Sequence, residues 1–328
     1  YLKRSLKILK MNNNFFNVLR AGINTTYQDE GRFGMQHIGL PPSGCMDNKS
    51  FLIANSIIGN KKFTGVIEFA YQGPLLELAK GKTKFVITGN VNFKIYKNNE
   101  TIEGDCNRSY DLNEGDKIDI LATKNSAYGY LSVEGGFDLE SFYNSVSTLV
   151  KAQIGPNNGS KIKSGDKIKI NTLSKNNNNF KANVFDENAN VIRVLKGPQY
   201  HYFSEKSKKL FFSQFYQITN LTDRMGMRLE GGVLKNIVSA NIRSEGITKG
   251  AIQVPADGQP IVLLTDHPTI GGYPKIANVI SADYDLLVQK TPGTNISFKC
   301  IELKEAEQLY KDRHNNISKI INNIKEIN

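Results

Sequence analysis

Short apolar runs rich in β-branched residues recur along most of the chain, and turns containing glycine or asparagine separate them. Runs of about four to eight residues between turn residues are typical of β-strands. On this basis we expect strands at 84–88, 117–121, 191–195 and 261–265. The pattern therefore predicts a mainly β protein.

Two segments depart from the β pattern. Residues 47–58 place apolar side chains at helical spacing, with Asp47 as a candidate N-cap and Gly59 as a candidate stop. From Leu303 onward, apolar positions follow a seven-residue spacing. This spacing predicts a C-terminal helix that packs on the body of the protein or on a partner.

A weak repetition divides the chain into two halves. Residues 68–75 and 194–200 each pair a strand with a Gly-Pro dipeptide, and each opens a run of further strands. Between them, the asparagine run 176–179 has no apolar periodicity and is typical of a linker or loop. We expect these segments: an N-terminal extension over 1–14, β halves over 15–185 and 186–302, and the terminal helix over 303–328.

Basic residues outnumber acidic ones, with 42 Lys and Arg against 31 Asp and Glu and a formal net charge of +11. Most of the excess lies in two segments, residues 1–10 and 151–181. Neither segment alternates arginines with stacking aromatic residues, as a nucleic-acid groove would. We therefore expect no nucleic-acid partner.

The cysteines and the apolar runs bear on the cellular location of the protein. Cys45, Cys106 and Cys300 are odd in number and have no Cys-x-x-Cys spacing, so we expect neither a disulfide framework nor a metal site. No apolar run approaches the roughly 20 residues that span a bilayer, so we expect no membrane association. These features favour a reducing cytoplasm.

The first candidate site is a pair of irregular stretches, 28–34 and 39–47. Their glycines and prolines, together with Ser43, break regular structure, and Asp29, Arg32 and Asp47 lie close together in sequence. Irregular backbone of this kind can present amides and a guanidinium to an anionic ligand. The alternative is a structural loop, because turns need glycine and proline in any case.

The second candidate site is the stretch 222–231, with the sequence TDRMGMRLEG. Arg224 and Arg228 are close enough in sequence to clamp one carboxylate or phosphate with bidentate geometry. The alternative is a surface strip of ion pairs, which would contribute little stability.

The third and densest candidate site is the stretch 250–277. Polar residues surround strand-sized apolar runs there, an arrangement that suits a pocket lined from strand ends and loops. These residues are Gln253, Asp257, Gln259, Asp266, His267, Thr269, Tyr273 and Lys275. His267 is a candidate general base because imidazole titrates near neutrality, and a hydrogen-bonded loop histidine is the alternative.

Two glycine-containing stretches fail as phosphate-binding loops. Gly271-Gly272 has no lysine after it at the required spacing. Gly81-Lys82-Thr83 has Leu76 at the position where such a loop needs its first glycine. From the residues alone, the chain is a mainly β protein with a polar pocket in its second half.

Taken together, these clusters resemble the allophanate hydrolase subunit 2 or biotin-dependent carboxyltransferase-like family, which includes the C subunit of 5-oxoprolinase and KipA-type proteins. The resemblance covers about residues 16–298. It rests on the stretches QDEGRFG, PPSGCMD with Ala54-Asn55 and Gly59-Asn60 after it, Glu68 with Gly73-Pro74, Arg193 with Gly197-Pro198-Gln199, TDRMGMRLEG, and IQVPADGQPIVLLTDHPTIGGYPKIA. It implies a cyclophilin-like β-barrel architecture in two related halves.

The resemblance also implies a function. We expect the C subunit of a bacterial ATP-dependent 5-oxoprolinase, which works with subunits A and B to open 5-oxoproline to glutamate. ATP would be used by the complex. The alternatives are a non-catalytic KipA-type regulatory protein, and a carboxyltransferase-like subunit that acts on urea or another small amide. The chain has no Ala-Met-Lys-Met sequence for biotin attachment, so we do not expect a complete urea carboxylase.

Carried onto this sequence, the resemblance suggests a pocket for a small amide or lactam that bears a carboxylate. An arginine would pair with the carboxylate, and Lys275 or Arg228 would stabilise an oxyanion or acyl-phosphate. The expected catalytic residues are Arg228, Lys275 and Asp266. The expected substrate-binding residues are Arg32, Ser43, Asp47, Arg224, Gln253, Thr269, Gly272 and Tyr273. His267-Pro268 stand where family members often carry Arg-Gln.

Overall fold

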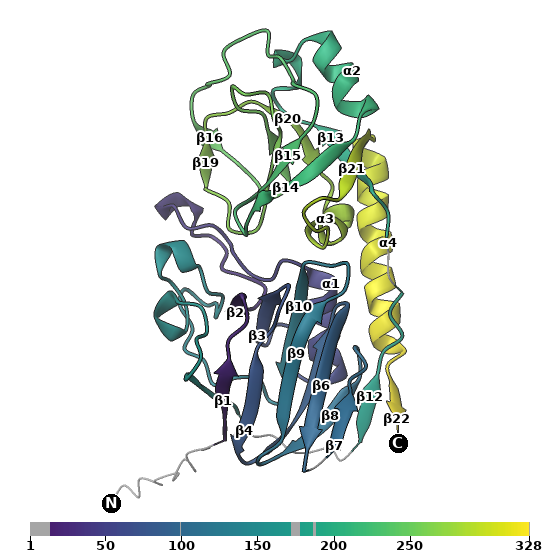
Figure 1. The fold of residues 1–328 in the computed structure, drawn as a ribbon. Helices are drawn as coiled ribbons and strands as arrows, with labels where there is room; N and C mark the ends of the chain where they lie inside the picture. The colour runs from purple at the N-terminus through teal and green to yellow at the C-terminus, as the bar shows by residue number, and fades with distance from the viewer. Residues whose placement is uncertain (1–13, 99, 172–177, 186–187, 328) are drawn as a thin grey trace, which may run out of the picture.

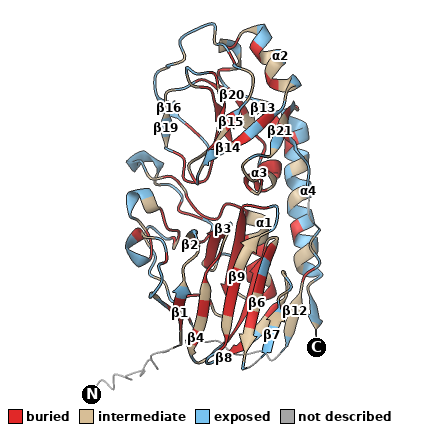
Figure 2. Cartoon of the chain, in the orientation of Figure 1, coloured by how far each residue is buried: buried red, intermediate tan, exposed pale blue. Residues whose placement is uncertain are grey.

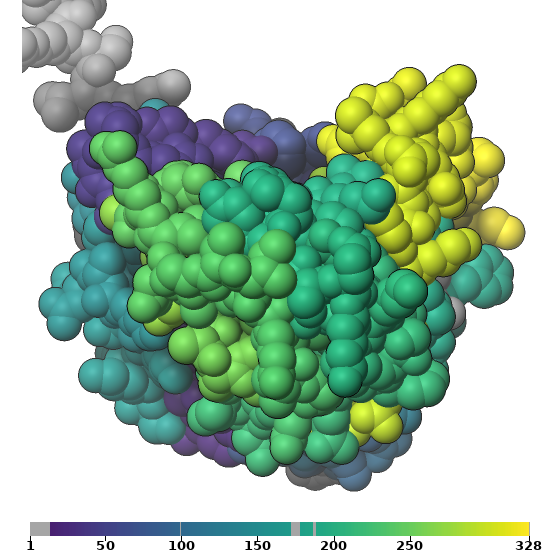
Figure 3. Space-filling view, turned by 90° about the horizontal axis from the view of Figure 1, so that it is seen from above, coloured from purple at the N-terminus to yellow at the C-terminus, as the bar shows by residue number. Residues whose placement is uncertain are grey.

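A computed structural model describes residues 14–327, except 99, 172–177 and 186–187. The described part consists of two β bodies stacked one above the other, and a long C-terminal helix runs along one side of both (Figure 1). Seen from above, the helix stands beside the upper body, in yellow (Figure 3). None of the helices in the described ranges is long and apolar enough to cross a membrane.

The first body contains two antiparallel sheets, with strand orders β11-β1-β4-β9-β6-β7 and β2-β3-β10-β5-β8. Their strands are β1 (Phe15–Arg20), β2 (Asn24–Gln28), β3 (Val66–Ala70), β4 (Leu75–Lys80), β5 (Lys82–Thr88), β6 (Val91–Lys97), β7 (Glu100–Glu103), β8 (Ser109–Asn113), β9 (Lys117–Thr123), β10 (Tyr128–Val133) and β11 (Lys167–Lys169). Side chains alternate between the two faces of a strand, and in β6 Val91, Phe93 and Ile95 are buried while Asn92 is exposed. The inward-facing residues form one apolar core, shown in red in Figure 2.

The second body is a closed barrel with the strand order β13-β20-β17-β18-β15-β14-β21. These strands are β13 (Val191–Lys196), β14 (Tyr216–Thr222), β15 (Gly226–Glu230), β17 (Ala251–Gln253), β18 (Ile261–Leu263), β20 (Lys275–Val279) and β21 (Asn295–Cys300). Met227, Ile252 and Val262 belong to the buried core cluster and fill the barrel. A short pair, β16 (Glu245–Gly246) and β19 (Ile270–Gly271), lies outside the barrel sheet.

Four α-helices accompany these strands in the described residues: α1 (Asn48–Ile57), α2 (Glu205–Ser213), α3 (Ser281–Val288) and α4 (Leu303–Asn322). Four 3-10 turns also occur there: η1 (Gln36–Ile38), η2 (Val150–Ala152), η3 (Asn157–Gly159) and η4 (Tyr200–Tyr202). Asp47 caps α1 by accepting a hydrogen bond from the Ser50 backbone N–H, as the sequence predicts. Ser204 caps α2 in the same way.

The two bodies share a core and a helical brace. One buried cluster contains Met46 and Tyr130 from the first body together with Leu264 and Tyr284 from the second. Helix α4 packs against α1 and α3, and the final strand β22 (Lys325–Ile327) pairs with β12 (Asn179–Lys181). The bodies are therefore joined by apolar burial as well as by the chain.

The mainly β prediction and the C-terminal helix are confirmed. The four expected strands lie within or overlap β5, β9, β13 and β18. The barrel closes only in the second body, because the strands of the first body separate into two sheets. The terminal helix ends at Asn322, and the following residues form β22 instead of more helix.

Two predictions fall partly outside the described residues. The N-terminal extension lies there almost entirely, and so do residues 176 and 177 of the asparagine run. The last residue of that run, Asn179, begins β12. Helices α2 and α3 were not predicted. Helix α3 is buried on nearly every side, so it lacks the polar face that marks an amphipathic helix.

Candidate functional site

The candidate residues separate into two groups in space. The junction group lies where the two bodies meet, and the barrel group lies on the second body. The junction group is Arg32, Ser43, Asp47, Arg224 and Asp266. The barrel group is Arg228, Gln253, Thr269, Gly272, Tyr273 and Lys275.

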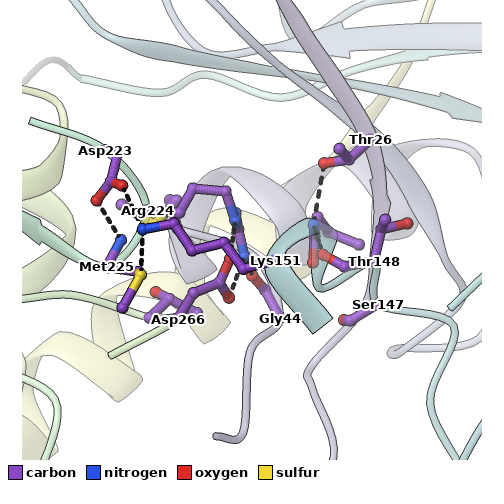
Figure 4. A network of polar contacts seen from close by, with 12 residues as sticks. Thr26, Gly44, Ser147, Thr148, Lys151, Asp223, Arg224, Met225 and Asp266 are labelled. Atoms are coloured by element: carbon purple, nitrogen blue, oxygen red, sulfur yellow. Dashed lines mark hydrogen bonds and ion pairs between the residues drawn. The ribbon is translucent and has the colours of Figure 1, made fainter. Parts of the chain in front are cut away.

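Arg224 is buried at the junction, and each of its three side-chain nitrogens has a protein partner. Nε donates to Asp266 at 2.8 Å, and Nη2 donates to the Gly44 carbonyl at 2.6 Å. Nη1 donates to Glu68 on β3 of the first body. Figure 4 shows Arg224 beside Asp266 and Gly44. The guanidinium therefore joins the two bodies through one buried ion cluster.

Burial and the neighbouring charges together set the protonation of this cluster. Desolvation raises the pKa of Glu68, although Arg224 and the Met46 backbone N–H lower it. Burial alone would lower the pKa of Arg224, but Asp266 and Glu68 hold it well above its ordinary value. Because two carboxylates surround one cation, removal of that cation would leave uncompensated buried charge.

Arg32 and Ser43 are buried near the same junction. Arg32 Nη2 donates to the Ser147 carbonyl, whereas Nε and Nη1 have no hydrogen-bond partner among the described residues. Burial lowers the pKa of Arg32, and Asp29 opposes that effect. Ser43 adopts a left-handed backbone with φ of 56°, and its Oγ is likewise without a described partner.

Asp47 and His267 are both held by local hydrogen bonds. Besides capping α1, Asp47 accepts from Gln289 Nε2 at 2.8 Å, and burial together with Asp285 raises its pKa. His267 Nδ1 lies 2.6 Å from the Pro268 carbonyl oxygen, and burial lowers the pKa of the imidazole. Both residues thus have structural partners in the junction.

A cavity of about 360 Å³ opens beside this ion cluster. Residues of both bodies line it, including Arg224, Asp266, Tyr128 and Lys151. Lys151 Nζ lies 3.3 Å from Asp223 Oδ2 and close to the Met225 sulfur, so it spans from the first body to the second (Figure 4). The cavity combines an apolar wall with a basic rim.

Three residues of the barrel group form a row across four adjacent strands. Lys275 on β20 pairs with Gln253 on β17, Gln253 pairs with Ile261 on β18, and Ile261 pairs with Arg228 on β15. Side chains alternate between the inside and the outside of the barrel along each strand. The neighbours of Gln253, Ile261 and Arg228 fill the barrel, so these three side chains face outward. The register therefore collects Lys275, Gln253 and Arg228 on the outer face of the barrel.

Lys275 is at one end of this row and is almost fully buried. Its Nζ lies 2.5 Å from Glu245 Oε1, and Gln199 Nε2 donates to the same oxygen at 2.8 Å. These two contacts lower the pKa of Glu245. The Gly197 backbone can pass close to Lys275 because it has no side chain; a Cβ at Gly197 would overlap the backbone of Lys275.

Gln253 lies beneath the short β16–β19 pair. Its Nε2 is buried and has no hydrogen-bond partner among the described residues, and a Cβ on Gly271 would lie 2.6 Å from it. The segments 242–247 and 269–272, which we call the flap, are linked by β16–β19 pairing and by backbone hydrogen bonds such as Ile247 N–H to the Thr269 carbonyl.

The remaining members of the barrel group lie on or next to the flap. Thr269 and Gly272 flank β19 in the flap, and Tyr273 follows it with its side chain partly exposed. Arg228, at the far end of the row, pairs with Asp257. Three strand spacings separate Arg228 from Lys275, which amounts to about 14 Å between their Cα atoms.

The barrel row suits a ligand atom that carries or develops negative charge. Lys275 supplies a positive charge and Gln253 supplies an N–H donor without a described acceptor, and both suit an acceptor on which negative charge develops. At the junction, Arg224 is already bonded at every nitrogen, whereas Nε and Nη1 of Arg32 have no partner among the described residues. No group of His, Cys, Asp or Glu side chains suited to a metal ion occurs in the described ranges.

Sequence reasoning missed Glu68, Glu245 and Gln199 as site residues. Glu68 had a signal, because it is the one charged residue in the otherwise apolar run 66–70, and a buried charge requires a partner. Gln199 belongs to the Gly197-Pro198-Gln199 motif, but the motif alone gives it no role. Glu245 lies in a polar, irregular stretch and carries no local signal.

Comparison with known proteins identifies a matching family and several similar proteins. The family model described as carboxyltransferase domain, subdomain A and B, matches residues 38–300. The C subunit of the 5-oxoprolinase of Escherichia coli strain K12 is 32% identical over 296 residues, which cover 90% of this chain and 94% of that protein. The urea amidolyase of Lachancea kluyveri is 30% identical over 320 residues, which cover 90% of this chain but 17% of that protein.

A solved structure of a urea amidolyase is also similar to this chain in three dimensions. The crystal structure of the K. lactis urea amidolyase superposes with a TM-score of 0.83 and 28% sequence identity. The match covers 93% of this chain and 20% of that one. The chain therefore corresponds to nearly all of the E. coli protein and to a small part of the urea amidolyases.

Proposed function

The chain belongs to the carboxyltransferase domain, subdomain A and B, family, and from this membership we propose that it is the C subunit of a bacterial ATP-dependent 5-oxoprolinase. In this proposal it contributes, with subunits A and B in the cytoplasm, to the opening of 5-oxoproline to glutamate. The observation that carries the proposal is the alignment with the C subunit of the E. coli enzyme, which covers nearly the full length of both proteins at 32% identity. The urea amidolyases share only a small part of their length with this chain.

We assign substrate contact to the Lys275 end of the barrel row. A small lactam that bears a carboxylate has two acceptors, the carboxylate and the ring carbonyl. Lys275 and Gln253 lie opposite each other on neighbouring strands and supply one donor for each acceptor. Gln253 Nε2, which has no described partner, would donate to the carbonyl oxygen as negative charge develops on it.

The other candidate residues receive roles according to their position. Thr269, Gly272 and Tyr273 would cover the ligand from the flap and its edge. Arg228 is too far along the row to share a small lactam with Lys275, so we propose that it contacts a group supplied by a partner subunit, such as a phosphoryl oxygen.

We propose that the junction group has a supporting role. Arg224 and Asp266 would hold the two bodies in the orientation that places the flap over the barrel row. Arg32, Ser43 and Asp47 would shape the loop that leads into α1 at the same junction.

We propose that the complex uses ATP. Gly81 lies between β4 and β5, and Lys82 and Thr83 begin β5, so no helix N-terminus follows the triplet to receive a phosphate. The residues present there do not fit a phosphate loop. The triplet therefore does not supply an ATP site.

Reconstitution tests the proposed function. The chain is mixed with candidate subunits A and B, and ATP-dependent glutamate formation from 5-oxoproline is measured with each component omitted in turn. We expect activity in the full mixture and its loss when this chain is left out. Equal activity without this chain would refute the assignment.

Carboxyl transfer to a small amide is the second candidate function, and the urea amidolyase relatives favour it. The two functions differ in their need for biotin. Lactam opening by the complex should be insensitive to avidin, which sequesters biotin. Inhibition by avidin, together with carboxylation of urea, would favour the transferase.

A further inference from the structure

Glu245 and Gln199 lie at the Lys275 end of the barrel row. The proposed function gives neither of them a role. Lys275 Nζ and Gln199 Nε2 converge on Glu245 Oε1, at 2.5 and 2.8 Å. Gln199 Oε1 in turn accepts a hydrogen bond from the Lys275 backbone N–H at 3.2 Å. One carboxylate oxygen thus pairs with the Lys275 ammonium and accepts a hydrogen bond from Gln199.

The two partners of this ion pair differ in how firmly they are held. The Lys275 side chain is 3% exposed, whereas the Glu245 side chain is 43% exposed and lies on the flap. A buried ammonium needs an anion, because an unpaired buried charge is costly. Glu245 is the more exposed of the two partners, so its carboxylate is the one that another anion can replace.

A second donor lies under the same flap. Gln253 is 6% exposed, and its Nε2 has no hydrogen-bond partner among the described residues. It is one strand away from Lys275, or about 4.8 Å across the sheet, and it lies directly beneath Gly271. A buried amide donor without a partner points to a missing acceptor at this place.

We propose that Glu245 occupies, while the flap is closed, the position that the substrate's carboxylate takes when the substrate binds. Lys275 and Gln199 then bind that carboxylate, and Gln253 receives the amide or lactam carbonyl next to it. This inference rests on the proposed function and deepens it. It makes the ligand a small amide or lactam with an adjacent carboxylate, and it makes Glu245 a competitor of that ligand.

Binding to the full chain without partner subunits tests this inference. 5-Oxoproline is titrated into the wild-type protein and into Glu245→Gln, and 2-pyrrolidinone, which has the same lactam but no carboxylate, is titrated in parallel. Because Glu245→Gln removes a competing half-exposed ion pair, we expect 5-oxoproline to bind at least about fivefold more tightly to the variant. Binding of 2-pyrrolidinone should show no such gain.

Two further variants test whether the gain in affinity comes from loss of the competing Glu245 carboxylate or only from a change in net charge or folding. Glu205→Gln removes an equivalent negative charge from an exposed pair with Lys208 on α2 and should leave the affinity for 5-oxoproline unchanged. Gln199→Met should weaken binding of 5-oxoproline in the Glu245→Gln background, because one carboxylate donor is lost. Thermal denaturation of each variant verifies that it is folded.

Equal or weaker binding of 5-oxoproline by Glu245→Gln would overturn the inference, and so would the absence of binding by both proteins. This result is independent of the reconstitution. If the assembled complex opens 5-oxoproline while Glu245→Gln gains no affinity, the competitor role of Glu245 fails and the proposed function stands. If the complex is inactive while the gain is observed, the carboxylate site stands and the assigned reaction fails.

Discussion

At the scale of single residues, Arg224 is a buried charged group at the junction of the two bodies. It binds Asp266 of its own body and Glu68 of the other, and both carboxylates are buried. Removal of a buried cation between two buried anions destabilises a protein, because the two anions are left buried without a counter-charge.

Replacement of Arg224 by methionine should therefore destabilise the protein strongly. We expect the free energy of unfolding to fall by about 3–5 kcal/mol, measured by urea denaturation at neutral pH. Lys151→Met is the matched control, because it removes a cation from the exposed pair with Asp223 and should cost less than about 1 kcal/mol. Equal losses for the two variants would show that the cluster contributes no more than a surface pair.

His267 should make stability depend on pH near neutrality. Burial lowers its pKa below the ordinary value of 6.5, so the unfolded chain takes up a proton at a higher pH than the folded chain does. The contribution to stability is complete above pH 6.5 and is lost as the pH falls toward the lowered pKa of the folded state. Urea denaturation across this range should show a smaller pH dependence for His267→Gln than for the wild type. An identical pH dependence in the two proteins would contradict this account.

The sequence predicted which residue types carry the polar chemistry but not how they group. Arg224 and Arg228 are four positions apart, and we expected them to act on one ligand. The first lies in the turn before β15 and is buried at the junction, whereas the second lies on β15 and faces outward. Only the register across β15, β18, β17 and β20 shows which distant residues share the barrel row.

At the scale of elements, α4 is a brace between the two bodies. It packs against α1 of the first body and α3 of the second, and its Arg313 pairs with Asp285 on α3. Ile317 is buried in the core cluster that both bodies share. The helix should therefore stabilise the whole molecule and not only its own end of the chain.

Truncation of a buried α4 side chain measures that contribution. Ile317→Ala should lower the free energy of unfolding by about 2–5 kcal/mol, because it leaves a cavity in the shared core. Leu303→Ala, at the exposed start of the same helix, is the control and should cost less than about 1 kcal/mol. If the two losses in a denaturation experiment were equal, the bracing role of α4 would be wrong.

Elements with a local signal were predictable, and those without one were not. Helix α1 was found from its N-cap and apolar spacing, and α4 from its apolar repeat. Helix α3 has buried residues on nearly all sides, and α2 is a short, lysine-rich segment, so neither resembles the long amphipathic pattern. The strand β22 forms only because β12 is available to pair with it.

At the scale of the whole molecule, the sequence predicted two β halves but not how each one closes. Closure depends on which distant strands pair, as in the parallel contact between β13 and β21 that completes the barrel. Neither strand carries a local signal for that pairing. The shared core and the buried Arg224 cluster then fix the two bodies as one unit, with the flap and barrel row on the second body.

In our proposal, this chain contributes the Lys275 end of the barrel row to a 5-oxoprolinase. The most direct measurement is ATP-dependent glutamate formation by the reconstituted complex that contains Lys275→Met, with Lys299→Met on the exposed face of β21 as the matched control. We expect at least about a hundredfold loss of turnover for Lys275→Met, comparable with removal of a stabilising group at a developing charge, and wild-type turnover for Lys299→Met. Wild-type turnover by a folded, assembled Lys275→Met complex would contradict the claim.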